Sequence, residues 1–151
     1  MKSLKLVVVG ALASLALSSA VAAQDCPRGT LDIRFCDVDG DMVADTPTDP
    51  SKQVDPDTLI FTYTPVEDPA VYVSVWAEFM DHLAEVTGKK VQFFPVQSNA
   101  AQIEAMRSGR LHIAGFNTGS NPLAVNCAGF RPFTIMASLD GNFGYEMEII
   151  T

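Results

Sequence analysis

The sequence has 151 residues, 48% of them hydrophobic and 19% charged, so it can form one domain with a buried core and is not compositionally disordered. Its formal net charge is −8 at pH 7. Nucleic acids and anionic membranes carry the same sign of charge, and the composition therefore disfavours both as binding partners.

Residues 1–23 have the pattern of a secretory signal peptide. Lys2 and Lys5 give a basic start, residues 4–20 form an apolar run, and the small residues of "AVAA" allow cleavage after Ala22 or Ala23. An uncleaved anchor helix fits less well, because the apolar run is short for a membrane span and ends in an A-x-A pattern. Cleavage removes two lysines and no acids, which leaves a mature net charge of −10.

Residues 24–57 are predicted to form an acidic, loop-like extension. They are rich in Asp, Pro and Thr and show no sustained periodicity. Exported chains meet oxidants, so Cys26 and Cys36 are expected to form a disulfide around a short loop. Cys127 is then the odd cysteine, either a buried free thiol or one whose partner is missing.

The extension contains a candidate calcium loop, "CDVDGDMVADTPTDP". Four of its carboxylates occupy positions one, three, five and nine of a calcium-binding loop, namely Asp37, Asp39, Asp41 and Asp45. Gly40 stands at position four rather than six and no Glu occupies position twelve, so the loop is not an EF-hand. Thrombospondin-like calcium loops tolerate similar patterns, and a solvated acidic linker is the open alternative.

Strands and helices alternate in the remainder, residues 58–151. Strands are predicted at 59–63, 90–96, 111–116, 133–138 and 145–150. Helices are predicted at 70–87, ending at Gly88, at 99–109, capped by Ser98 and ended by Gly109, and briefly after residue 121. This order predicts an α/β fold, a mostly parallel sheet flanked by helices.

Parallel α/β sheets bind ligands in the loops that follow the strands. Here those loops are residues 64–68, 97–99 and 117–121. In "GFNTGSNP", Thr118 and Ser120 can donate hydrogen bonds to an anion, and Gly119 lets a ligand approach the backbone. An ordinary turn with a helix cap is the alternative and is favoured by spacing alone, because no lysine lies nearby.

Catalysis is not predicted. His82 and His112 have no nearby Cys or His with which to form a metal pair, and surface or packed histidines explain both. No nucleophile motif such as Gly-x-Ser-x-Gly is present. We therefore expect a protein that is not an enzyme and needs no cofactor apart from the calcium ion considered above.

Several segments together resemble the phosphate/phosphite/phosphonate-binding periplasmic proteins of ABC transporters. They are "TPVEDP", "LAEVTGKKV", "AAQIEAMRSGRLHIAGF" and "GNFGYE", and the resemblance runs from about Leu59 to Thr151. It implies a type II periplasmic-binding fold, with two α/β lobes that close on a small oxyanion or phosphonate and deliver it to a membrane permease. The mature protein is then expected in the periplasm.

The resemblance also implies positions for the ligand site. The family presents a tyrosine after the second strand, where this chain has Asn99, and another that Tyr145 matches. Thr64, Ser98, Thr118 and Ser120 lie in the corresponding loops. Asn99 can donate a hydrogen bond but cannot pack like an aromatic ring on an organic substituent.

The chain departs from the family in length. Family members are about twice as long, so the resemblance implies only the first lobe, a truncated form with impaired ligand binding. The alternative from another functional class is an exported, calcium-stabilised interaction module whose working part is the acidic loop.

Overall fold

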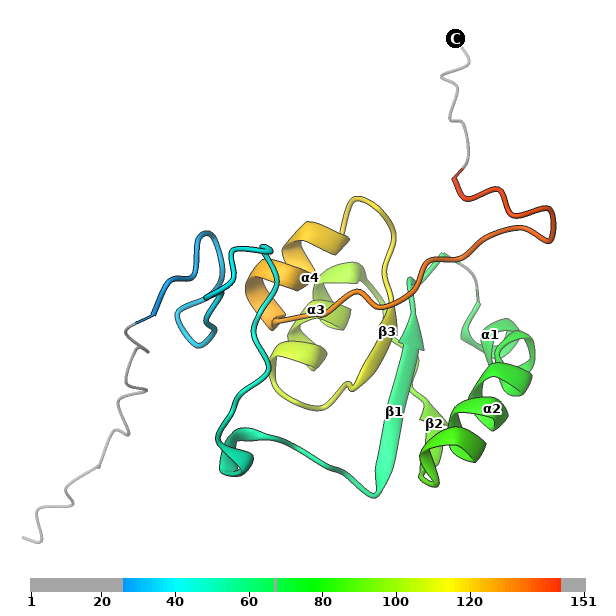
Figure 1. Cartoon of the computed structure of the whole chain (residues 1–151). Helices are drawn as coiled ribbons and strands as arrows, with labels where there is room; N and C mark the ends of the chain where they lie inside the picture. Colours follow the sequence, from blue (N-terminus) through cyan, green and yellow to red (C-terminus); the bar gives the residue numbers. More distant parts are fainter. Residues whose placement is uncertain (1–25, 67, 145–151) are drawn as a thin grey trace, which may run out of the picture.

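The computed structural model describes residues 26–66 and 68–144 (Figure 1). The sheet consists of β1 (Thr58–Tyr63), β2 (Lys90–Phe93) and β3 (Ile113–Gly115). The helices are the 3-10 turn η1 (Pro50–Lys52), α1 (Pro69–Val75), α2 (Ala77–Thr87), α3 (Asn99–Arg107) and α4 (Asn121–Ala128).

The three strands form a parallel sheet in the order β2-β1-β3. Leu59 pairs with Val91 on one side of β1, and Tyr63 pairs with Gly115 on the other. The chain leaves β1 for one neighbour and later returns to the other, so α1 and α2 lie on one side of the sheet and α3 and α4 on the opposite side (Figure 1). The predicted parallel α/β arrangement is confirmed.

Local capping signals define the helix ends. The Ser98 hydroxyl accepts a hydrogen bond from the Ala101 N–H (3.1 Å) and caps α3, as predicted. Gly88 ends α2 and Gly129 ends α4, both in the left-handed conformation (φ 67°) that glycine adopts without steric cost.

Three predicted elements differ from the structure. The helix predicted at 70–87 is broken at Trp76 (φ −94°, ψ 5°), where the indole packs against Phe61 (ring centroids 5.4 Å apart) and Tyr63 (4.9 Å). The second strand ends at Phe93, shortly before Pro95, which has no N–H for a sheet. Residues 133–138 are exposed and form no strand, because apolar alternation without a partner strand does not make a sheet. The strand predicted at 145–150 lies outside the described residues.

Each face of the sheet has its own apolar layer. Ala105, Leu111 and Ala114 form a buried cluster between the sheet and α3. On the other face Phe61 is 2% exposed and packs edge-on or tilted against Trp76, Phe79 and Phe93. Burying one such ring contributes about 2–3 kcal/mol to folding, and these layers hold the strand ends in fixed register.

The acidic extension is bound to the α/β unit. The predicted disulfide between Cys26 and Cys36 is confirmed (S–S 2.07 Å). Asp32 N–H donates to the Asn126 carbonyl (2.8 Å), and Arg34 donates to the carbonyls of Arg107 (3.1 Å) and Cys127 (2.9 Å), at the carboxyl ends of α3 and α4. Cations are favourable at helix carboxyl ends, so these bonds fix residues 26–36 on the helical layer.

Two further features complete the fold. Cys127 is a free and exposed thiol, so the prediction of a buried one is wrong. Cys127 is the next-to-last residue of α4, and its side chain faces the surface.

In the described part of the chain, the helices are all too short or too polar to cross a membrane.

Candidate functional site

The carboxyl ends of the three parallel strands meet at one edge of the sheet. The described residues of the loops that follow them, 64–66, 68, 94–98 and 116–120, form what we call the sheet edge. From β1 the chain turns to α1 on one face, whereas from the adjacent β3 it turns to α4 on the other (Figure 1). Such a reversal opens a crevice between neighbouring loops, where open α/β sheets bind ligands.

Thr64 ties the first loop to the third. It is 3% exposed, and its hydroxyl donates to the Gly115 carbonyl (3.1 Å) while accepting from the Asn117 N–H (3.1 Å). Its own N–H also donates to Gly115 (3.0 Å). The hydroxyl proton of Thr64 is therefore already used, and the residue positions the loops that surround a ligand.

The third loop is organised by Asn117. Its side-chain oxygen accepts from both the N–H and the hydroxyl of Ser120 (2.8 Å each), and Ser120 is 3% exposed. Thr118 and Gly119 remain exposed at the tip. Their N–H groups donate to no other described residue, so these two backbone donors are available to an anion.

Asn117 was not predicted from the sequence as a site residue. The available signal was an Asn directly after a strand and before "TGS", because Asn side chains commonly bond to the backbone of a turn.

Amide side chains lie in the first turns of α3 and α4, the helices that follow the second and third loops. Gln102 of α3 is fully buried, and its Nε2 donates to the Gly115 carbonyl (2.9 Å). Its Oε1, together with Oδ1 of Asn99 and of Asn121, is buried and has no hydrogen-bond partner among the described residues. These oxygens are acceptors, so a hydrogen-bond donor rather than an anion would satisfy them. Gln102 was missed because it reads as a helix residue.

The predicted residues are only partly brought together. Bonds through Asn117 and Gly115 connect Thr64, Ser120 and the newly found Gln102. Ser98 uses its hydroxyl as the cap of α3, and Asn99 follows it one turn before Gln102. Within the described chain no hydrogen bond joins Ser98 or Asn99 to Thr64 or Ser120. Tyr145 lies outside the described residues.

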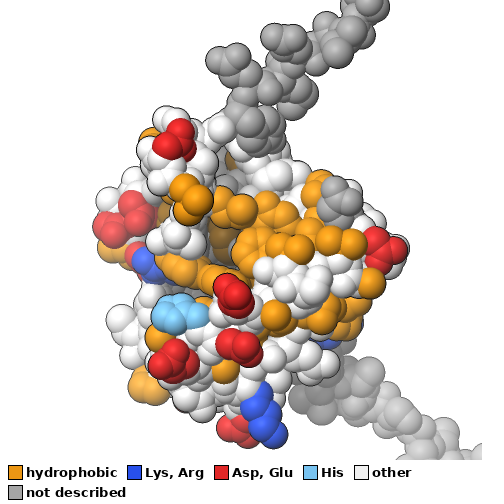
Figure 2. Space-filling model, turned by 90° about the vertical axis from the view of Figure 1, so that its right-hand side faces the viewer, with side chains coloured by type: hydrophobic (Ala, Val, Ile, Leu, Met, Phe, Trp, Pro, Cys, Tyr) orange, Lys and Arg blue, Asp and Glu red, His pale blue; other side chains and the backbone are white. Residues whose placement is uncertain are grey.

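Aromatic side chains form the wall on the α1 side. The Tyr72 hydroxyl donates to the Thr64 carbonyl (3.0 Å) and accepts from the Val66 N–H (3.2 Å), which holds the first loop. The Tyr63 ring lies so close to Gly115 that a Cβ there would be 2.3 Å from it, so only glycine fits. Figure 2 views this side and shows a broad apolar surface on it. Val66 of the first loop and Val71 of α1 are both exposed.

The donors of the sheet edge are uncharged. They are backbone N–H groups, amides and hydroxyls, with the amino-terminal ends of α3 and α4 beside them. Helix amino termini carry a partial positive charge, and with free N–H groups they favour anions. Chemically, the arrangement can bind a small anion by hydrogen bonds.

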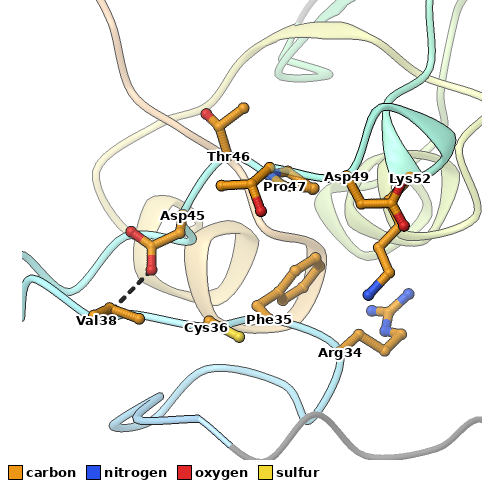
Figure 3. Close-up of a pocket in the computed structure, with 10 residues that line it drawn as sticks. Arg34, Phe35, Cys36, Val38, Asp45, Thr46, Pro47, Asp49 and Lys52 are labelled. Carbon is orange, nitrogen blue, oxygen red and sulfur yellow. Dashed lines mark hydrogen bonds between the residues drawn. The ribbon is translucent and has the colours of Figure 1, made fainter.

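The predicted metal ligands lie elsewhere, on the extension. Oxygen atoms of Asp37, Asp39 and Asp41 all lie within 4.8 Å of one another. Asp45 does not belong to this group; its carboxylate accepts from the Val38 N–H (2.8 Å; Figure 3). The structure therefore brings three of the four predicted residues together, and metal binding by them stays a prediction.

A cavity of about 230 Å³ also lies on the extension (Figure 3). Phe35 and Pro47 supply apolar walls, and Asp45, Arg34 and Lys52 supply charges of both signs. None of its lining residues belongs to the sheet edge, so this cavity is separate from the candidate anion site.

Residues 61–151, more than half of the chain, match the protein family described as "ABC transporter, phosphonate, periplasmic substrate-binding protein". The chain belongs to this family. It is also similar to the crystal structure of a binding protein component of an ABC phosphonate transporter from Pseudomonas aeruginosa, with 25% sequence identity and a TM-score of 0.45. That match covers 47% of this chain and 24% of the Pseudomonas chain, so our chain spans only part of that protein's length.

The family is one of periplasmic substrate-binding proteins that serve transport, and it is not an enzyme family. The predicted family is confirmed.

Proposed function

We propose that this protein is the periplasmic solute-binding component of an ABC importer for phosphonate-, phosphite- or phosphate-like oxyanions. The observation that carries the proposal is the sheet edge: the N–H groups of Thr118 and Gly119, which bond to no other described residue, lie in the loop that Asn117 and Thr64 hold in place. Membership of the phosphonate-binding family supports the same ligand class.

In the proposed complex, oxyanion oxygens accept hydrogen bonds from the third loop and from the side-chain NH₂ group of Asn99. The Gln102 amide already donates to the Gly115 carbonyl (2.9 Å), so it positions the end of β3 and is not proposed as a ligand donor. Ser98, Ser120 and Tyr145 are proposed to complete the site. Asn99 in place of an aromatic ring favours small anions over phosphonates with bulky substituents.

Export and transport follow from the same assignment. Residues 1–23 act as a cleavable signal peptide, and the loaded protein docks on an ABC permease in the inner membrane. We further propose that residues 24–151 alone bind weakly, because the family's clamp uses two lobes and residues 58–151 correspond to the first.

Calorimetric titration tests the proposal with phosphate, phosphite and methylphosphonate as ligands. For residues 24–151 we expect a Kd of about 1 mM or weaker, and for a version carrying both lobes about 1 μM or tighter. If the two-lobed version gives no heat of binding with any of the three anions, the oxyanion assignment is contradicted. Micromolar affinity of residues 24–151 would contradict the role of the second lobe.

A matched pair of substitutions tests the third loop. Gly119→Pro removes a backbone donor, whereas Gly119→Ala keeps it and adds a methyl group whose nearest described neighbour would be Asn117 Oδ1 at 3.7 Å, an ordinary contact. In the two-lobed version we expect about tenfold weaker binding for the proline variant and nearly unchanged binding for alanine, since one hydrogen bond to a charged group contributes about 1.5–3 kcal/mol. Equal affinities would remove this donor from the site.

The alternative function, a calcium-stabilised interaction module, stays a prediction. The structure offers an observation for a cation site itself but none for a protein partner of the acidic loop, so we treat the cation site separately below.

A further inference from the structure

Residues 37–45, which we call the acid loop, gather carboxylates around one point. One oxygen each from Asp37, Asp39 and Asp41 lies within 4.8 Å of the other two. At such separations two like charges repel by about 1 kcal/mol in water and by several times more near a protein surface. Without a counter-ion, the native fold therefore maintains an unfavourable arrangement here.

Asp37 is the second, independent observation. Its side chain belongs to this cluster, and the residue is only 7% exposed. Its Oδ1 is buried and has no hydrogen-bond partner in the described part of the chain, while Oδ2 accepts from the Met42 N–H (3.2 Å). Asp32 on the same extension shows the contrast, because its carboxylate accepts from Arg34 Nε (2.8 Å). A buried, unpaired carboxylate oxygen is costly unless a cation or a hydrogen bond compensates it.

The backbone of the acid loop has the turns that bring alternate carboxylates together. Gly40 (φ 76°) and Met42 (φ 67°) are left-handed, and Met42 stands at position six, where an EF-hand has its turn glycine. The carboxylates of Asp39 and Asp41 accept from the N–H groups two residues ahead (3.2 and 2.8 Å), which leaves their second oxygens free of these bonds. The glycine missing from position six in the sequence is thus replaced by a methionine in the same conformation.

We propose that the acid loop is a calcium site. Asp37, Asp39 and Asp41 supply side-chain oxygens, the Val43 carbonyl fills position seven, and Asp45 contributes at position nine through a water molecule. Calcium fits because it accepts six to eight oxygen ligands in flexible geometry, whereas magnesium requires a compact octahedron and retains its waters.

The site has a structural consequence for the extension. The acid loop begins directly after Cys36, and its far side is held by Arg131, which donates to the Ala44 carbonyl (3.0 Å). A calcium ion between these two anchors stabilises the docked extension on the α/β unit. It has no part in the anion site, which lies at the sheet edge.

The test is calorimetric titration of chelator-treated residues 24–151 with calcium chloride, with thermal melting in calcium and in EGTA. We expect a Kd of about 10⁻³ M or tighter, the weak end known for extracellular calcium modules. At a calcium concentration about 100 times the Kd, the Tm should rise by about 5–10 °C. Magnesium should bind at least about tenfold more weakly.

Asp39→Asn and Asp41→Asn are the informative variants, because both residues are exposed and asparagine keeps the oxygen that accepts the local N–H. We expect each to lower calcium affinity at least about tenfold, yet to melt in EGTA at or above the wild-type Tm, since each removes repulsion. Asp81→Asn, an exposed acid on α2, is the matched control and should leave calcium affinity unchanged. The inference is overturned if calcium gives neither heat of binding nor a rise in Tm, or if magnesium binds as tightly as calcium. It is also overturned if both the Asp39→Asn and Asp41→Asn variants bind calcium as tightly as the wild type.

Discussion

The acid loop and the sheet edge are both polar, but they differ in charge and in the way the backbone holds them. The acid loop places three carboxylates together in a segment without regular secondary structure. A disulfide and side-chain hydrogen bonds to helix ends anchor this segment. The sheet edge offers uncharged donors in loops that regular strands place. The first arrangement is suited to a hard cation and the second to a small anion.

The comparison shows that the net charge of the chain does not describe the charge around each candidate site. The chain carries −8 overall, yet its family binds phosphonates. Its acids are concentrated on the extension, with nine between residues 25 and 57. The backbone donors of the sheet edge are separate from them, and we propose that an anion would be bound there by local hydrogen bonds rather than by a positive field.

Replacing Cys26 and Cys36 by serine gives the largest expected effect. The bond joins residues ten apart in sequence, and removing a cross-link of this size lowers the free energy of unfolding by about 2–3 kcal/mol. Because Cys36 adjoins the acid loop, calcium affinity should fall as well. Urea unfolding and calorimetry measure both quantities. Unchanged stability would mean that the disulfide contributes nothing to the anchoring of the extension.

Thr64→Val tests the sheet edge with an isosteric change. It removes the hydroxyl that joins Gly115 to Asn117 and leaves the Asn117 N–H unpaired, which should cost about 2 kcal/mol of unfolding free energy. Calcium affinity should not change. Thr118→Val is the control, because Thr118 is exposed and its substitution should cost less than about 0.5 kcal/mol. Equal losses would show that Thr64 does not organise the loops.

Asp32→Asn should have a smaller effect that depends on pH. The hydrogen bond from the Arg34 side chain is the main cause that lowers the pKa of Asp32 below its usual value, with Arg34 and Arg107 charges adding to it. A lowered folded-state pKa stabilises the protein above the unfolded-state pKa of about 3.9, and this contribution is lost as the pH falls through the folded-state value.

We therefore expect Asp32→Asn to lower stability by about 1 kcal/mol at neutral pH. The difference from the wild type should shrink steadily below about pH 4. Thermal melting over this range measures it. If the stability difference between the variant and the wild type instead grows as the pH falls, the pKa of Asp32 is raised rather than lowered by folding.

The sequence predicted the regular part of the fold well because its signals are local. The Ser98 cap, the left-handed glycine at position 88 and the apolar runs define the ends of their elements without long-range information. The errors occurred where tertiary contacts decide: the aromatic cluster breaks the long helix at Trp76, and residues 133–138 have no strand beside them.

The site was predictable only as a set of loops. Residues 64, 98–99 and 117–120 follow from strand order and the resemblance, but the bonds that assemble them do not. Gln102 reaches Gly115 from a helix 13 residues away, and Arg34 reaches Cys127 across 93 residues. Contacts of this kind depend on three-dimensional packing, which no spacing in the sequence encodes.

The central claim is that one chain holds two separate sites of opposite charge preference. It is tested most directly by the amide NMR spectrum of ¹⁵N-labelled residues 24–151, titrated in separate samples with calcium chloride and with methylphosphonate, each to about 10 mM so that weak binding is detected. We predict that calcium shifts the amides of residues 37–45, and that methylphosphonate shifts those of residues 64–66, 98–99 and 117–121. Shifts by both ligands in the same loop, or no localised shift with methylphosphonate, would contradict the account.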